Sequence, residues 1–364
     1  MKTLHTLLFS LAAVCALSAC NRAQTPTSQH AGDAHAMAPA ALAPQVELLS
    51  AGEAPRQPLR YQLQAGRQER LRLELALAMA AQVGQEGGGQ AAPPLVLDIV
   101  AGPTEKVGAD RLRYRLQVRK ASLQLTEAEQ AAHGEAIERD LALLRQLGGS
   151  VEVDTRGLTH HVALDVPSAP ISPRFRSMLG NIRTALFSVP LPVEAVGVGA
   201  RWRAKRIVDL QAFQVEQEVT YTLTALQGPR GTLQVTVRQS AAPQRLEDPK
   251  SGAQASLQAY ETSGVGSVRF HLGHLTPVSE ADVSSILRAS LPKAEGQAVP
   301  LQVHMLSKVQ VYPEYAGSRT PTVGLRKAKD DSDSAQDSTA GTPKPATAAP
   351  DATLEHTSQS TAAP

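Results

Sequence analysis

Hydrophobic residues recur at every second position through most of the middle of the chain. The clearest run is 71–79, whose odd positions are leucine or methionine and whose even positions include Arg72 and Glu74. Runs with the same period follow at 112–118, 213–223, 233–237, 268–272 and 301–311. A period of two is typical of strands that bury one face, and a solvated opposite face indicates antiparallel pairing. The pattern predicts a large antiparallel sheet.

Two further segments fit paired strands. Apolar residues alternate from Val283 to Leu291, which predicts a strand joined to 301–311 by a hairpin loop at 293–297. A helix over 280–290 is the alternative for this segment. Residues 151–166 have the pattern of a second hairpin.

Two segments have a helical period instead. Thr126 and Glu129 have the spacing of a capping box, and Gly148-Gly149 follows the apolar stripe of this first helix. Ser172-Pro173 opens a second amphipathic helix that ends before Pro190. A large sheet with one apolar face needs a cover, and we expect these helices to supply it. The predicted fold class is therefore α+β: a large curved antiparallel sheet, half-barrel-like, covered by two short amphipathic helices.

The first 20 residues have the layout of an export signal. Met1-Lys2 is a positive start, and an apolar run extends from Leu4 to Leu17. This run is shorter than the roughly 20 residues that a membrane-spanning helix needs. It ends at Leu17-Ser18-Ala19-Cys20, which resembles the lipobox of bacterial lipoproteins. The resemblance implies cleavage before Cys20 and lipid attachment to this cysteine, whereas an ordinary signal with an incidental cysteine is the alternative.

Composition divides the remainder of the chain. Small and polar residues dominate before residue 57 and after residue 316, which is typical of segments without a packed core. The predicted plan is a signal peptide at 1–19, a lipidated flexible tether at 20–56, a single mostly antiparallel domain at 57–316, and a disordered low-complexity tail at 317–364. The lipobox implies a membrane as partner through Cys20. Asn21, which is not aspartate, favours the periplasmic face of the outer membrane.

Charge and cysteine usage exclude several classes of function. The chain has 36 basic and 34 acidic side chains, a net charge of +2, which argues against a nucleic-acid partner. The other cysteine, Cys15, lies in the predicted signal, so the mature domain has no disulfide and no thiol chemistry. Aromatic residues make up 3% of the chain, which argues against a sugar-stacking groove.

Candidate chemistry is sparse. His160-His161 and His271 with His274 are the best metal candidates, but side chains one or three positions apart point to opposite faces of a regular strand. Distortion at Gly273 is the exception that would bring the second pair together, and His160 fits the edge of the core. We predict no metal, no cofactor and no catalytic residue.

Other motifs also lack a chemical partner. The carboxylates of Asp98, Asp165, Glu216 and Glu218 are scattered without an established pairing. The glycine-rich segment 84–89 lacks the Lys of a phosphate loop and is interpreted as a flexible connection.

Two resemblances bear on function. The predicted architecture is similar to the half-barrels of LolA- and LppX-type lipid-binding proteins. The segment Pro190-Leu191-Pro192-Val193, followed by Val196 to Trp202, resembles an uncharacterised group of envelope lipoproteins over about 150–280. The first resemblance implies an apolar ligand such as a lipid chain. A structural or assembly lipoprotein that contacts an envelope protein is the alternative, and an enzyme has the least support.

Overall fold

The computed structural model of the chain describes residues 43–165, 188–210, 213–247, 254–292 and 298–316. All of these belong to one compact unit, Met1–Leu325. Five predicted features lie outside the described residues: the signal at 1–19, Cys20, the helix expected over 172–187, the loop at 293–297 and the tail at 317–364.

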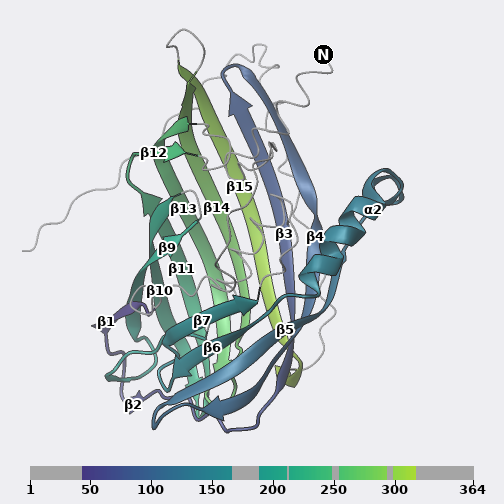
Figure 1. Cartoon of the computed structure of the whole chain (residues 1–364). Coiled ribbons are helices and arrows are strands. Elements are labelled where there is room, and N and C mark those ends of the chain that lie inside the picture. Colours follow the sequence, from purple (N-terminus) through teal and green to yellow (C-terminus); the bar gives the residue numbers. More distant parts are fainter. Residues whose placement is uncertain (1–42, 166–187, 211–212, 248–253, 293–297, 317–364) are drawn as a thin grey trace, which may run out of the picture. The chain divides into compact units, whose positions relative to one another are not determined.

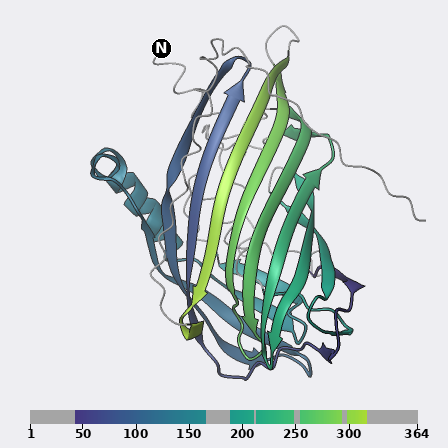
Figure 2. The same ribbon diagram turned by 180° about the vertical axis from the view of Figure 1, so that it is seen from behind.

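Thirteen strands form one antiparallel sheet (Figure 1 and, from behind, Figure 2). Its order is β1 (Gln45–Ser50), β9 (Arg201–Asp209), β10 (Gln214–Gln227), β11 (Arg230–Ala241), β13 (Gln254–His271), β14 (Val278–Pro292), β15 (Ala298–Pro313), β3 (Glu69–Val83), β4 (Glu86–Lys106), β5 (Arg111–Leu123), β6 (Gly148–Asp154) and β7 (Thr159–Asp165). The thirteenth strand, β12 (Gln244–Glu247), pairs with β13, and β2 (Gln57–Pro58) pairs with β8 (Ala195–Val196) in a separate ribbon. The described helices are α2 (Glu127–Leu144) and the 3-10 turn η4 (Glu314–Ala316).

The antiparallel sheet confirms the prediction from the alternating pattern. Val283 to Leu291 lie in β14, which pairs with β15 from Ser279↔Val311 to Pro292↔Ala298, so the strand is correct and the helix is not. The hairpin at 151–166 is confirmed by β6 and β7. The α+β class is wrong, because strands dominate the described residues and α2 is their only α-helix.

The helix α2 begins as predicted but does not cover the sheet. Thr126 Oγ1 accepts from Glu129 N at 3.3 Å, and Glu129 Oε2 accepts from Thr126 N at 2.8 Å, which completes the capping box. Only Leu141 and Leu144 of the helix are buried, both near its end. The helix therefore lies beside β5 at one side of the sheet (Figure 1), because its first half has no apolar face to bury.

The folded part begins before the predicted boundary at residue 57. The strand β1 falls within the predicted tether, and it pairs with β9 from Gln45↔Lys205 to Ser50↔Arg201. Its Val46 and Leu48 pack against a buried core cluster. These two apolar residues are two positions apart, which is the period of a strand, but the small and polar composition of the segment masks this signal.

Two glycine segments behave differently from each other. Gly87, Gly88 and Gly89 lie in β4 opposite β3, so the flexible connection predicted for 84–89 is wrong except at the turn residue Gly84, whose φ is +61°. Before β9, Gly199 has a φ of +82°, a left-handed backbone conformation that favours glycine. Gly197 is needed for space, because an added Cβ would lie 1.8 Å from the carbonyl oxygen of Glu53.

The sheet bends until the ends of strands that are far apart in its order come close together. Tyr61 N donates to the carbonyl oxygen of Thr155, a residue in the turn that follows β6, at 2.7 Å. The next residue, Gln62, donates its N–H to the carbonyl oxygen of Leu272, which follows β13, also at 2.7 Å. Six steps separate β13 from β6 in the sheet, a distance of about 29 Å in a flat sheet. Neighbouring residues are only about 3.8 Å apart. The sheet is therefore strongly curved, as predicted, with β1 and β7 as the two ends of its strand order.

The apolar face of the sheet is the one that carries Leu71, Leu73 and Leu75. Three clusters of buried side chains occupy it: one on β3 to β7 with the end of α2, one centred on Leu257 and Leu287, and one around Trp202. Among the described residues, no helix is both long enough and apolar enough to cross a membrane.

Candidate functional site

Half-buried apolar side chains form a strip across the apolar face, between the fully buried clusters. The strip consists of Val219 and Tyr221 on β10, Val235 and Val237 on β11, Val283 on β14, Val309 on β15 and Leu77 on β3. Strand register aligns these residues in two adjacent rows, which we call the apolar strip. The residues of the strip are half-buried, whereas many of their neighbours on the apolar face are fully buried.

The strip lacks side chains where it crosses β13. Its rows cross β13 at Gly264 and Gly266, neither of which carries a side chain. An added Cβ would lie 2.9 Å from Val283 Cγ2 at Gly264 and 2.4 Å from Glu280 O at Gly266, so close pairing with β14 requires both glycines.

A row of polar side chains borders the strip on the same face. This polar row consists of Arg206, Gln217, Gln239, Thr262 and Ser285, which register aligns across β9, β10, β11, β13 and β14. Arg206 Nε donates to Gln217 Oε1 at 2.6 Å, and the hydroxyls of Thr262 and Ser285 lie 2.8 Å apart. The polar row separates the apolar strip from the cluster around Leu257.

The end of the strip at β9 is packed around the single tryptophan. Trp202 is completely buried, and its Nε1 donates to Pro190 O at 2.8 Å. Its ring stacks on Tyr221 of the strip, with centroids 5.6 Å apart. Burial raises the pKa of Tyr221 to about 12, while the positive charge of Arg206 opposes the rise.

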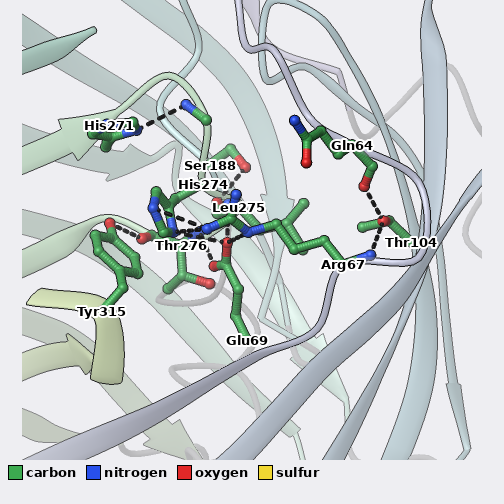
Figure 3. Close-up of polar contacts among 11 residues, drawn as sticks. Gln64, Arg67, Glu69, Thr104, Ser188, His271, His274, Leu275, Thr276 and Tyr315 are labelled. Carbon is green, nitrogen blue, oxygen red and sulfur yellow. Dashed lines mark hydrogen bonds and ion pairs between the residues drawn. The ribbon is translucent and has the colours of Figure 1, made fainter.

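A second polar feature, at the start of β3, is a buried carboxylate. Glu69 Oε1 accepts from Leu275 N at 3.0 Å, and Oε2 accepts from Thr276 N at 3.2 Å. Both donors lie in the turn between β13 and β14. Nδ1 of His274 lies 3.1 Å from the same Oε1, and Nε of Arg67 lies 3.3 Å from it. This polar clamp fastens the turn to the beginning of β3 (Figure 3).

His274 lies between Arg67 and Tyr315 (Figure 3). The Tyr315 ring stacks on the imidazole with centroids 3.5 Å apart, and its hydroxyl donates to Thr276 O at 2.6 Å. Arg67 Nη2 lies 3.0 Å from both ring nitrogens of His274. An atom equally close to both nitrogens lies against the face of the ring. The imidazole is therefore enclosed by two flat groups.

This enclosure changes the titration of the clamp. The pKa of His274 is lowered to about 4, first by burial and then by the charge of Arg67. Burial raises the pKa of Glu69, although the two backbone N–H donors and Arg67 oppose the rise. The imidazole is consequently uncharged at neutral pH. The nearby Ser188 Oγ donates to Leu275 O at 3.0 Å and does not bond to this imidazole, so the two side chains do not form a nucleophile–base pair. Ser188 and the clamp instead hold the same turn in place.

Replacing His274 by Gln is expected to alter the pH dependence of stability. The folded-state pKa of about 4 lies below the ordinary value of 6.5, so the unfolded chain binds a proton that the folded chain rejects between these values. Between about pH 7.5 and about pH 5, the free energy of unfolding of the parent therefore falls by about 1 kcal/mol, with solvent screening taken into account. The variant has no imidazole at this position and should not show this fall. Urea unfolding at about pH 7.5 and about pH 5 measures it. If the difference in free energy of unfolding between parent and variant is the same at both pH values, the lowered pKa of His274 is refuted.

The structure places the predicted metal candidates in two locations. His160 Nε2 lies 3.0 Å from Asp154 Oδ2 at the edge of the core. The turn at Gly273 does bring His271 and His274 together, with ring centroids 4.8 Å apart. In the described part of the chain, however, no three His, Cys, Asp or Glu side chains are grouped so as to hold a metal ion.

The predicted carboxylate candidates lie on the solvated face. Asp98 pairs with Arg72 at 2.9 Å, Asp165 with Arg115 at 3.5 Å, and Glu218 with Arg203 at 3.4 Å. The pairs of Asp98 and Glu218 join neighbouring strands, whereas the pair of Asp165 spans from β7 to β5 across β6. Exposed pairs of this kind contribute about 0–1 kcal/mol each. Glu216 lines a depression on the same face. The structure therefore does not bring these acids together as a catalytic pair.

Two depressions accompany these features. One of about 440 Å³ lies between α2 and β5, lined by Ile137 and Leu141 together with polar residues such as Lys120. The other, of about 900 Å³, lies on the solvated face over β9 to β14, where Ile207 and Ile286 stand among charged side chains. Both depressions are lined by apolar and charged residues together, so neither offers a purely apolar surface to a ligand.

Sequence reasoning missed the clamp and the polar row, although a signal for each was present. Glu69 lies two and four positions before Leu71 and Leu73, and Arg206 lies four positions after Trp202, so each charged residue shares a strand face with apolar residues. A charged residue in an apolar register is rare enough to mark a buried polar contact.

Comparison of the sequence with models of known protein families gives no match, and comparison with curated protein sequences gives none either.

Proposed function

We propose that this chain is a lipid-anchored protein of the bacterial cell envelope that holds an acyl chain against the apolar strip. The proposal joins two parts. The lipobox at Leu17-Ser18-Ala19-Cys20 supplies the anchor, and the curved sheet supplies the ligand surface. Asn21 supports a location at the periplasmic face of the outer membrane.

The observation that carries the proposal is the half-buried state of the strip. Its side chains lie among fully buried neighbours yet keep contact with solvent. Full burial of an exposed apolar side chain stabilises by about 1.5–3 kcal/mol, and completing the burial of a half-buried one gains part of this. A ligand that covers several of them therefore gains a large apolar contribution without a change in the fold.

The dimensions of the strip fit one lipid chain. It crosses six strands, from β10 to β3, and five strand spacings amount to about 24 Å. A membrane lipid chain reaches about 15 Å, half of the hydrocarbon thickness of a bilayer. The strip is thus long enough for a single extended chain that lies across the strands.

Mass spectrometry of co-purified ligands tests this proposal. The mature chain, residues 20–364, is produced without its signal and with Cys20→Ser, so that no acyl group is attached covalently. We expect an acyl-containing molecule to be released when the purified protein is denatured, because the strip is buried on binding. Recovery of protein without any apolar molecule would count against the proposal.

A structural or assembly role remains the second candidate. The observation that favours it is the depression on the solvated face, where Ile207 is 46% exposed. Under this role the same purification, performed from membranes, yields an envelope protein and no lipid.

A further inference from the structure

We infer that one end of the domain docks on the surface of the bilayer that holds the lipid anchor, through exposed aliphatic side chains on two interlocked loops. The loops are 49–60 and 192–200, and together they are called the apolar tip. This inference rests on the anchor of the proposed function and does not depend on the acyl site. It adds an interaction surface and an orientation of the domain toward the membrane.

The tip gathers exposed apolar side chains. Leu49, Val193 and Val198 are 43%, 60% and 39% exposed, and they are three of the eight large hydrophobic side chains that are exposed in the described part of the chain. Smaller exposed residues of the same loops are Ala54, Pro55, Pro58 and Ala195. Exposed apolar patches with a polar rim mark contacts with proteins or membranes.

Backbone contacts lock the two loops together. Glu53 N donates to Val198 O at 2.8 Å, and Gly197 N donates to Ala51 O at 2.9 Å. Gly52 packs so closely that an added Cβ would lie 2.6 Å from Val198 O. The short ribbon of β2 and β8 joins the same segments, and Figure 1 shows β2 at one end of the sheet. The exposed side chains are therefore held on a fixed backbone, so docking requires no change of the fold.

Two arginines fasten the tip further. Arg60 Nη1 donates to Pro192 O at 3.0 Å, and its Nη2 donates to Val193 O at 2.6 Å. Arg56 donates to Gly52 O through Nε at 2.9 Å and through Nη2 at 2.6 Å. Both guanidinium groups thus bond to backbone carbonyls of the tip.

The charges of the tip balance. Its charged side chains are Glu53, Arg56, Arg60 and Glu194, two of each sign. Attraction to anionic headgroups needs an excess of basic residues, which the tip does not have. The aliphatic side chains must therefore supply the attraction to the bilayer, and docking should depend on neither headgroup charge nor salt.

The position of the tip relative to the anchor identifies the bilayer as its partner. The described chain begins at Ala43, and the roughly 23 residues from Cys20 to this point can extend to about 80 Å at most. Leu49 follows closely at the end of β1, so the tip lies within about 20 Å of Ala43. The anchor therefore confines the tip near the membrane, and confinement makes contacts effective that are weak in a free protein.

Single-cysteine labels test the docking on the lipidated chain, because Cys20 is the only cysteine after the predicted signal. Val198→Cys and the control Val265→Cys each receive an environment-sensitive fluorophore and are reconstituted in phosphatidylcholine vesicles with brominated acyl chains. Val265 is 63% exposed and lies outside the tip, on β13. We expect the label at position 198 to shift to the blue and to lose emission, and the label at position 265 to do neither.

Charged variants test the apolar origin of the docking, with the label placed by Leu49→Cys. Val193→Asp combined with Val198→Asp should abolish the shift and the loss of emission. Val265→Asp combined with Leu306→Asp changes exposed apolar residues elsewhere and should leave both signals intact. Circular dichroism confirms that each variant is folded. Addition of phosphatidylglycerol or of salt should change neither signal.

The outcomes separate the docking from the anchor. Equal signals at positions 198 and 265, or signals at position 49 that survive Val193→Asp with Val198→Asp, would overturn the docking. Signals that require phosphatidylglycerol and vanish in salt would overturn its apolar basis. Burial of the label in native membranes but not in vesicles would identify a protein as the partner instead. A chain whose mass shows no lipid would overturn the anchor, and the docking with it.

Discussion

Replacing Glu69 by Ala is expected to lower the free energy of unfolding by about 3 kcal/mol. The carboxylate of Glu69 accepts the backbone N–H groups of Leu275 and Thr276, and all three residues are buried. Alanine would leave both donors without an acceptor, and each such group costs about 1–3 kcal/mol. The variant also removes the partner of His274 Nδ1. Urea unfolding at neutral pH measures the change.

Two matched substitutions show whether the loss comes from the hydrogen bonds. Glu69→Gln keeps one carbonyl acceptor and should lose about half as much stability as alanine. Glu74→Gln changes a second buried acid on the same strand, whose Oε2 has no hydrogen-bond partner among the described residues and whose pKa is raised by burial. This control should be neutral or slightly stabilising. Equal losses at Glu69 and Glu74 would show that burial of the side chain matters and the clamp does not.

Replacing Cys20 by Ser is expected to move the mature chain from the membrane fraction to the soluble fraction. Two or more acyl chains hold a protein firmly on a bilayer, and the resemblance to a lipobox implies that all of them are attached to this one residue. Fractionation after secretion, read by immunoblot, measures the shift. Cys15→Ser is the matched control, because it changes the other cysteine and leaves the predicted lipidation site intact. Membrane retention of the processed Cys20→Ser chain would contradict a single anchor.

Strand positions could be predicted because burial of one face leaves a period of two in the sequence. The run at 71–79 is the clearest example: it lies within β3, and the burial of Leu71, Leu73 and Leu75 follows the alternation. The segment around Val283 was decided correctly for the same reason. Local patterns of this kind depend only on neighbours in the sequence.

Features that depend on distant contacts could not be predicted in this way. The capping box of α2 is local and was found, but the position of α2 beside β5 depends on which helix residues meet an apolar surface. The strand β1 is short, and its partner β9 lies more than 150 positions later in the chain. Composition alone therefore assigned β1 to the tether.

The apolar strip and the polar row require register across the whole sheet. Val219, Val237 and Val283 come from three strands, and only their pairing places them in one row. A shift of one residue in any strand would turn its members to the other face. The sequence therefore indicates which residues are apolar, and the structure indicates which of them form a common surface.

Ligand mass spectrometry on a charged strip variant tests the acyl site most directly. Val237→Asp places a carboxylate in the strip, while Thr236→Asp places one on the opposite face of the same strand and serves as the control. Both mature chains carry Cys20→Ser, and both must remain folded by circular dichroism. We expect the parent and Thr236→Asp to release an acyl-containing ligand on denaturation and Val237→Asp to release little or none. Equal amounts from all three proteins, or none from the parent, would contradict an acyl site on the strip.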